Sequence, residues 1–159
     1  MEALAKKLGD RLKQRGHKLV TAESCTGGWL AQVITSIPGS SRWFERGFVT
    51  YSNESKQELL AVKRETLARC GAVSEEAARE MAEGALRQSH AQIAIAITGI
   101  AGPEGGTQGK PVGTVWFAWA ERGQPTRSAL RCFAGDRATV RYEAVKAALE
   151  GLLKRLMPL

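Results

Sequence analysis

Apolar positions at helical and strand spacing divide this chain into alternating helices and strands. Leu4, Leu8 and Leu12 recur every four residues among Lys and Arg side chains, which predicts an amphipathic helix over residues 2–16. Residues 93–98 form an apolar run of the kind found in a strand that is buried on both faces. Asp136 is placed to cap a long final helix. The apolar face of that helix carries Val140, Ala144, Ala148, Leu152 and Leu156.

The order of the elements predicts the fold class. Further strands are expected at 18–23, 44–52, 112–120 and 127–133, and further helices at 27–36, 55–61, 65–70 and from a Ser74 cap to about residue 89. Helices and strands alternate first, and three strands then follow one another. We therefore expect an α/β fold, a three-layer α/β/α sandwich with a mixed, mostly parallel sheet, in a single domain over residues 1–159.

Charge and composition narrow the choice of partners. The net charge of +7 favours an anionic partner, but the basic residues are spread along the chain, so they are interpreted first as a solvated surface, next as including a phosphate site, and least as a nucleic-acid surface. No segment has the length of a membrane span or the pattern of a secretory signal. Cys25, Cys70 and Cys132 are too far apart for a zinc motif or a disulfide framework, which fits a cytoplasmic protein without a bound metal.

Familiar catalytic motifs are absent. The Gly-rich segment 99–113 lacks the spacing of a phosphate-binding Walker motif, and no dinucleotide-binding glycine pattern occurs. His17 and His90 are the only histidines, and neither lies in a metal-ligand or triad pattern. Nucleophilic chemistry in this chain therefore needs a base other than histidine.

Residues 21–28, Thr-Ala-Glu-Ser-Cys-Thr-Gly-Gly, lead from a predicted strand into a predicted helix. Ser24, Cys25, Thr26 and Gly27 would lie at the helix N-terminus, where unpaired N–H groups favour negative charge. Such a segment can bind a phosphate, stabilise an oxyanion or activate a nucleophile. Equally, Ser24 or Thr26 can act as a simple N-cap followed by close packing of Gly-Gly.

Two further polar clusters follow predicted strands. Tyr51 and Lys56 come after the second strand, and lysine is a usable general base when burial lowers its pKa. Thr98 and Gly99 come after the most apolar strand. If these strands are parallel, their carboxyl ends bring the clusters to one edge of the sheet. Otherwise Lys56 is a solvated helix residue, Tyr51 a half-buried strand residue and the glycines form a turn.

Five segments in order together resemble the CinA carboxy-terminal domain family: residues 21–28, 46–53, 71–74, 98–103 and 110–115. The resemblance covers essentially the whole chain. It implies hydrolysis of the carboxamide of nicotinamide mononucleotide to nicotinate mononucleotide and ammonia, in pyridine-nucleotide (NAD) recycling, without a cofactor.

The resemblance also implies roles for single residues. Ser24 would be the nucleophile, Lys56 the base and Tyr51 an aid to proton transfer. The remaining expected substrate contacts are the Cys25, Thr26 and Gly27 backbone, Thr98, Gly99 and Arg137. The substrate phosphate is expected either at the Gly27–Gly28 helix start or against an arginine.

Alternatives remain open at this point. Cys25 is a second candidate nucleophile, because helix N-termini stabilise thiolates. The chain can also be a non-catalytic nucleotide-binding or regulatory module, because a fold does not establish an activity. A DNA-associated role lacks any recognisable binding motif. Trp43 and Phe44 lie in or near a predicted strand, where aromatic residues usually belong to the core. If they are exposed instead, they suit a homodimer interface.

Overall fold

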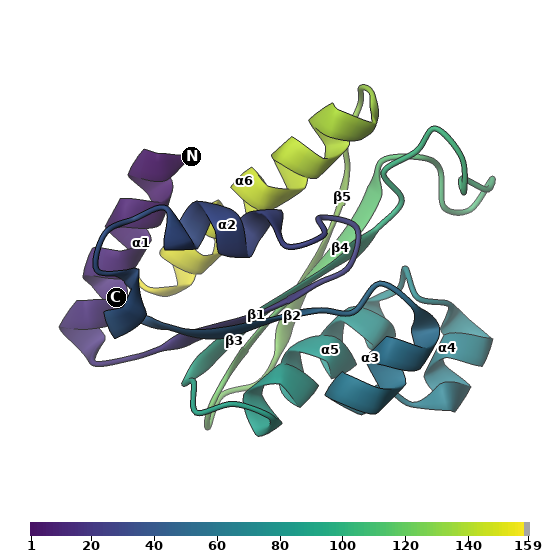
Figure 1. Cartoon of the computed structure of the whole chain (residues 1–159). Coiled ribbons are helices and arrows are strands. Elements are labelled where there is room, and N and C mark those ends of the chain that lie inside the picture. The colour runs from purple at the N-terminus through teal and green to yellow at the C-terminus, as the bar shows by residue number, and fades with distance from the viewer. Residues whose placement is uncertain (158–159) are drawn as a thin grey trace.

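Five strands form one mixed sheet between two layers of helices (Figure 1). The computed structural model describes residues 1–157, and the last two residues of the predicted domain, 158 and 159, lie outside it. The strands are β1 (Leu19–Glu23), β2 (Phe44–Val49), β3 (Ile93–Gly99), β4 (Thr114–Glu121) and β5 (Arg127–Cys132). The helices are α1 (Glu2–Arg15), α2 (Trp29–Thr35), α3 (Asn53–Leu60), α4 (Arg64–Cys70), α5 (Glu75–Arg87) and α6 (Arg137–Arg155), with a short 3₁₀ helix at Ser40–Arg42.

The strand order is β2-β1-β3-β4-β5. β1 pairs in parallel with both β2 and β3, whereas β4 pairs antiparallel with β3 and with β5. All strands except β4 therefore point in the same direction. The carboxyl ends of β1, β2 and β3 meet at one edge of the sheet, which is where an α/β sheet usually binds its ligand.

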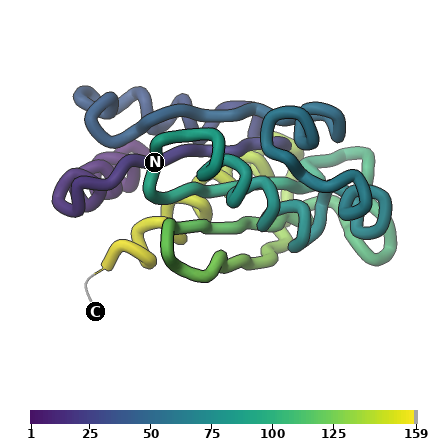
Figure 2. Tube along the Cα trace, turned by 90° about the horizontal axis from the view of Figure 1, so that it is seen from below, coloured from purple at the N-terminus to yellow at the C-terminus, as the bar shows by residue number. Residues whose placement is uncertain are grey.

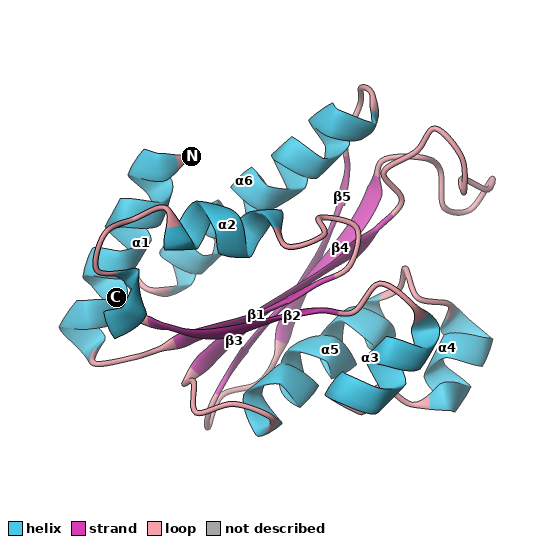
Figure 3. Cartoon of the chain, in the orientation of Figure 1, coloured by secondary structure: helices cyan, strands magenta, loops and turns pink. Residues whose placement is uncertain are grey.

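The two faces of the sheet carry different helices. α1, α2 and α6 cover one face, and α3, α4 and α5 cover the other (Figure 3). Viewed from below, α3 and α5 lie in front of the strands, and the loop between β3 and β4 projects from the body of the molecule (Figure 2). The predicted three-layer α/β/α sandwich with a mixed sheet is confirmed.

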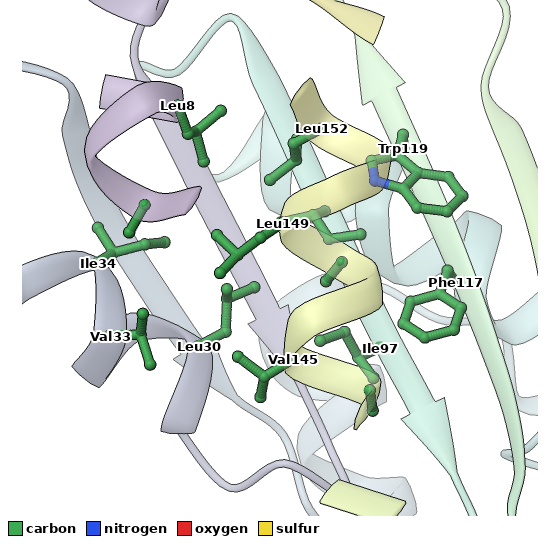
Figure 4. Close-up of a cluster of buried hydrophobic side chains, with 14 of the residues drawn as sticks. Leu8, Leu30, Val33, Ile34, Ile97, Phe117, Trp119, Val145, Leu149 and Leu152 are labelled. Carbon is green, nitrogen blue, oxygen red and sulfur yellow. The ribbon is translucent and has the colours of Figure 1, made fainter. Parts of the chain in front are cut away.

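Alternation along β3 explains the two cores. Ile93, Ile95 and Ile97 point to the α1, α2 and α6 side, where they join leucines and aromatic rings (Figure 4). Ala94 and Ala96 point to the other side, where they meet the alanine-rich face of α5. The small side chains on that side let α5 lie close to the sheet, as the period of two in a strand allows.

Some helix and strand ends differ from the predicted ones. α2 begins at Trp29 rather than at Gly27, because Gly28 has a φ of 100° and ends the preceding turn. β2 stops at Val49 rather than at residue 52, because Ser52 caps α3 through a hydrogen bond from the Ser55 N–H. The predicted caps at Ser74 and Asp136 are both present.

Trp43 belongs to the core, so the hypothesis of an exposed Trp43 at a dimer interface is wrong. Trp43 is only 1% exposed, because its indole lies against the backbone of Gly9 in α1. A Cβ at Gly9 would lie 2.5 Å from the ring, so the glycine makes room for it. Phe44 is half-buried against the same core. Trp43 is thus not available to a partner chain. Across residues 1–157, no helix combines the length and apolar character needed to span a bilayer.

Candidate active site

A pocket of about 280 Å³ opens at the carboxyl ends of β1, β2 and β3. Its volume is close to the lower end of the range for small-molecule sites. The sequence-predicted residues that line it are Ser24, Cys25, Tyr51, Lys56, Thr98, Gly99 and Arg137. The parallel strands thus bring together three clusters that are far apart in the chain.

Ser24 and Lys56 meet at the bottom of this pocket. Lys56 Nζ lies 3.0 Å from Ser24 Oγ and donates a hydrogen bond of 2.6 Å to the backbone oxygen of Thr50. Ser24 directly follows β1, and Lys56 projects from the first turn of α3. The two residues therefore come from different elements. A backbone hydrogen bond fixes each of them, from Ser24 N–H to Ile97 O and from Lys56 Nζ to Thr50 O.

Burial changes the chemistry of Lys56. The side chain is 1% exposed, and the loss of hydration lowers the pKa of its amine below the usual value, while Cys25 opposes this shift. A lower pKa increases the neutral fraction, which has a lone pair to accept a proton. With Thr50 O as acceptor for one N–H, a neutral Lys56 has the geometry of a general base toward Ser24.

The thiol of Cys25 is in a different state. Cys25 is 6% exposed, and burial raises the pKa of its thiol to about 11. At neutral pH the thiol is therefore protonated and a weak nucleophile. The expectation that a helix N-terminus would stabilise a thiolate is not met, because desolvation outweighs the nearby Arg141 charge.

The N–H groups at the start of α2 are bonded to a side chain of the protein, the carboxylate of Glu23. The buried carboxyl group of Glu23 accepts hydrogen bonds from the N–H groups of Leu30 and Ala31 at 2.9 and 3.0 Å, and from Thr26 Oγ1 at 2.7 Å. Thr26 is fully buried and, like Gly27, does not line the pocket. The predicted phosphate site at the Gly27–Gly28 helix start is therefore filled by an acidic side chain.

Arg137 and Tyr51 lie at the mouth of the pocket. Arg137 Nη1 donates to the backbone oxygen of Gly102 at 2.8 Å, and Nη2 donates to the Tyr51 hydroxyl at 3.2 Å. Tyr51 is 63% exposed. Within residues 1–157 its hydroxyl has no hydrogen bond to Ser24 or Lys56. Thr98 lines the wall and donates to the backbone oxygen of Ala72 at 2.8 Å.

A larger hollow of about 620 Å³ lies at the opposite end of the sheet. Arg15, Arg127 and Arg155 line it, and the Arg155 guanidinium lies 4.3 Å from the centre of the Trp119 ring. It holds no nucleophile paired with a base. Among the described residues, 1–157, no group of three or more His, Cys, Asp or Glu side chains is placed to hold a metal ion.

The comparison with known families identifies the family of this chain. The model of the CinA C-terminal domain matches residues 1–156. The chain belongs to this family. Among its curated relatives, nicotinamide-nucleotide amidohydrolase PncC of Escherichia coli K12 is 54% identical over 97% of this chain and 93% of the relative. The protein of the same name from Pseudomonas putida is 50% identical over 95% of this chain and 94% of the relative.

A solved structure of the CinA family has the same fold. The competence damage-inducible protein A from Klebsiella pneumoniae superposes with a TM-score of 0.94 at 47% identity, covering 98% of this chain and 96% of that one. The architecture described above is thus shared over nearly the full length of both chains.

Three contributors to the site were missed from the sequence. Glu23 seals the α2 N-terminus, Thr50 supplies a backbone oxygen to Lys56, and Arg141 bonds the turn that carries Ser24. An acidic residue directly before the Ser-Cys-Thr turn was a usable signal for Glu23. The spacing of four residues between Arg137 and Arg141 was a usable signal for Arg141, since such residues share a helix face. No local sequence pattern predicts that the Thr50 carbonyl accepts a hydrogen bond from Lys56.

Proposed function

We propose that this chain hydrolyses the carboxamide of nicotinamide mononucleotide, giving nicotinate mononucleotide and ammonia, in pyridine-nucleotide recycling. The observation that carries the proposal is the 3.0 Å approach of Lys56 Nζ to Ser24 Oγ inside the pocket. The two relatives named nicotinamide-nucleotide amidohydrolase support the choice of substrate. A protein that only bound the nucleotide would have no need of a serine paired with a desolvated amine.

The first half of the reaction acylates Ser24. Neutral Lys56, oriented by its bond to Thr50 O, takes the proton of Ser24 Oγ, and the oxygen attacks the carboxamide carbon. The resulting Lys56 ammonium then gives this proton to the departing nitrogen, and ammonia leaves. The product is an ester between Ser24 and the nicotinoyl group. Lys56 reaches Ser24 directly, so this scheme needs no relay through Tyr51.

The second half restores the enzyme. Water attacks the ester carbonyl, Lys56 accepts a proton from it, and the proton passes to Ser24 Oγ as the ester bond breaks. The carboxylic acid formed in this way loses its remaining proton to solvent and departs as the carboxylate. No step in this scheme draws on a cofactor.

Both halves create a negative charge on the carbonyl oxygen. The Cys25 N–H has no oxygen acceptor within residues 1–157, and Cys25 lines the pocket next to Ser24. We assign this N–H to the oxyanion, a contact worth about 3–4 kcal/mol of barrier in other enzymes. Residues 99–102 also line the pocket, and the glycines at both ends make room for neighbouring side chains, since a Cβ at Gly99 would meet Val115 and a Cβ at Gly102 would meet Val112.

We place the substrate phosphate against Arg137. The N–H groups of Leu30 and Ala31 are already bonded to Glu23, which excludes the main donors of the α2 N-terminus. Arg137 lines the mouth, and a guanidinium binds phosphate through two parallel hydrogen bonds. This orientation points the nicotinamide ring inward, toward Ser24.

Ammonia release tests the proposal directly. The substrate panel contains nicotinamide mononucleotide, nicotinamide riboside, free nicotinamide and the dinucleotide, each with the wild-type chain. We expect turnover of the mononucleotide and, for Ser24→Ala, a loss of at least about a thousandfold, because the acyl-enzyme route is removed. Ser36→Ala is the matched control, since the Ser36 hydroxyl bonds only a nearby backbone oxygen in α2.

Two results would count against the proposal. Turnover of free nicotinamide alone would exclude a nucleotide substrate. Full activity in Ser24→Ala would exclude Ser24 as nucleophile, and Cys25→Ala would then be the variant to compare.

A further inference from the structure

The first two turns of α6 carry two arginines, one at the pocket mouth and one on the turn behind it. Arg137 and Arg141 are four residues apart and share a helix face. Arg137 lies at the pocket mouth, as described above. Arg141 instead bonds the turn that carries the nucleophile: its Nε donates to the Cys25 carbonyl at 3.1 Å, and its Nη2 donates to the Thr26 carbonyl at 3.3 Å.

The central peptide of this turn, between Cys25 and Thr26, presents its carbonyl to Arg141. The Gly27 N–H donates to the Ser24 carbonyl at 3.0 Å, so Ser24–Gly27 is a hydrogen-bonded β-turn with Cys25 and Thr26 at its centre. The two common turn types differ in the orientation of the central peptide, here the Cys25 carbonyl with the Thr26 N–H, and both keep the outer hydrogen bond. The second type needs a positive φ at Thr26, which Thr26 does not have, so the turn has the first orientation and the hydrogen bond from Arg141 to the Cys25 carbonyl reinforces it.

Arg141 supplies that hydrogen bond with a fixed geometry. In a trans peptide the carbonyl and the following N–H point in opposite directions, so holding a carbonyl also sets the N–H. The planar guanidinium holds the Cys25 and Thr26 carbonyls at a set spacing, which a lysine amine does not do. The guanidinium also lies 5.4 Å from the centre of the Trp29 ring, so it is held on a second side by the first residue of α2.

The two members of the catalytic pair are held independently. Lys56 is oriented from α3 through Thr50 O. Ser24 is held on one side by its N–H, which donates to Ile97 O of β3 at 3.0 Å, and on the other side by the turn, whose conformation therefore contributes to the distance between Ser24 Oγ and Lys56 Nζ. Arg141 touches neither the pocket nor the reacting atoms, since it is not among the residues that line the pocket.

We propose that Arg141 is a positioning residue that holds the Ser24–Gly27 turn in the conformation needed for attack by Ser24. This inference rests on the proposed function for its main assay. A displacement of about 1 Å at a reacting group costs on the order of a hundredfold in rate. Loss of Arg141 is thus expected to lower kcat about a hundredfold and to leave KM within about threefold, because the substrate contacts remain.

The experiment compares Arg141→Met, Arg141→Lys and Leu152→Ala with the wild-type chain. Leu152 lies fully buried on α6, away from the pocket, so its variant is a matched control for loss of stability alone. For each protein, kcat and KM for ammonia release are measured at a temperature where it is folded, together with the thermal midpoint. Arg141→Lys should recover part of kcat, and Leu152→Ala should keep the wild-type kcat despite a lower midpoint.

A second readout does not depend on the natural substrate. The rate at which a fluorophosphonate labels Ser24, followed by mass spectrometry, reports the reactivity of the hydroxyl itself. We expect slower labelling in both Arg141 variants than in the wild type and in Leu152→Ala. If the wild type labels at Ser24 but does not hydrolyse the mononucleotide, the proposed function fails while this inference is still decided by the labelling rates.

Three results would overturn the inference: an unchanged kcat, a kcat that falls only with the folded fraction as in Leu152→Ala, or a rise in KM at constant kcat. The last result would make Arg141 a substrate contact. If Arg141→Met does not fold, Arg141→Lys decides alone, because a wild-type kcat and labelling rate in that variant exclude the proposed role. A wild type inactive in both assays counts against the inference as well as the function.

Discussion

Replacing Lys56 by Met tests whether a buried amine acts as the base. Lys56 is 1% exposed, and its Nζ contacts Ser24 Oγ and Thr50 O. Burial lowers the pKa of this amine, which favours the neutral form that can accept the Ser24 proton. A methionine fills most of the same space without an amine. The substitution therefore removes the base while it keeps most of the packing.

The expected loss of activity follows from the role of a general base. Such a group contributes about a hundredfold to ten-thousandfold in rate. That range corresponds to about 3–5.5 kcal/mol of activation free energy. Lys56→Met should lower kcat by this amount in the ammonia assay. In the wild type, kcat/KM should rise with pH as Lys56 loses its proton, and the midpoint of this rise should lie below the ordinary lysine pKa.

The same variant makes an independent prediction about stability. The folded-state pKa of Lys56 lies below the unfolded value of 10.5, so between these two pH values the unfolded chain binds more protons than the folded one. The free energy of unfolding of the wild type must therefore rise with pH across that window. The slope for one proton is at most about 1.4 kcal/mol per pH unit. Below the folded-state pKa the contribution of Lys56 is at its least favourable and flat.

Urea unfolding at a series of pH values measures this slope. The quantity of interest is the free energy of unfolding of the wild type minus that of Lys56→Met, from about pH 6 to pH 10. It should increase with pH, because the variant lacks the buried amine. A flat difference for Lys56→Met, or a kcat near that of the wild type, would refute the argument that burial creates a neutral base.

Three further variants test other parts of the structure. Cys25→Ser should keep most of the ammonia release, because the Cys25 thiol has a pKa of about 11 and is protonated at neutral pH; a loss as large as that of Ser24→Ala would contradict this. Gly84→Ala should destabilise the chain by at least about 3 kcal/mol in urea unfolding, because its Cβ would overlap the Leu60 carbonyl; a loss below about 1 kcal/mol would show that α5 shifts freely. Ser74→Ala should cost about 1 kcal/mol in the same assay, because Ser74 Oγ accepts the Ala77 N–H at the start of α5; an unchanged midpoint would show that the cap is replaceable.

Local patterns were sufficient to predict the framework of the fold. The apolar stripe of α6 and the apolar run of β3 depend on neighbours in sequence, and the structure has both where they were expected. The caps at Ser74 and Asp136 are also local, since each bonds an N–H three residues later. The strand order could not be obtained in this way, because it depends on pairings between distant segments.

Burial of single polar residues was the main feature that sequence did not reveal. The segment around Lys56 has the composition of a solvated helix, and only the packing of α3 beside the ends of β1 and β2 removes this lysine from water. Trp43 is a second case in which burial depends on a distant residue. An exposed Trp43 would suit an interface, but the absence of a side chain at Gly9 in α1 leaves room for the ring in the core. Both outcomes are set by residues distant in sequence.

The placement of charge in the site leads to one orientation of the proposed substrate. At the bottom of the pocket, Glu23 occupies the N–H groups of α2, and burial lowers the pKa of Lys56, which reduces the fraction of this amine that carries a positive charge. At the mouth, Arg137 retains a guanidinium that lines the opening. A phosphate is therefore drawn to the mouth and an uncharged carboxamide to the bottom, where Ser24 lies. A substrate without the phosphate would lose binding at Arg137 while its carboxamide still fits, so the riboside should show a raised KM more than a lowered kcat.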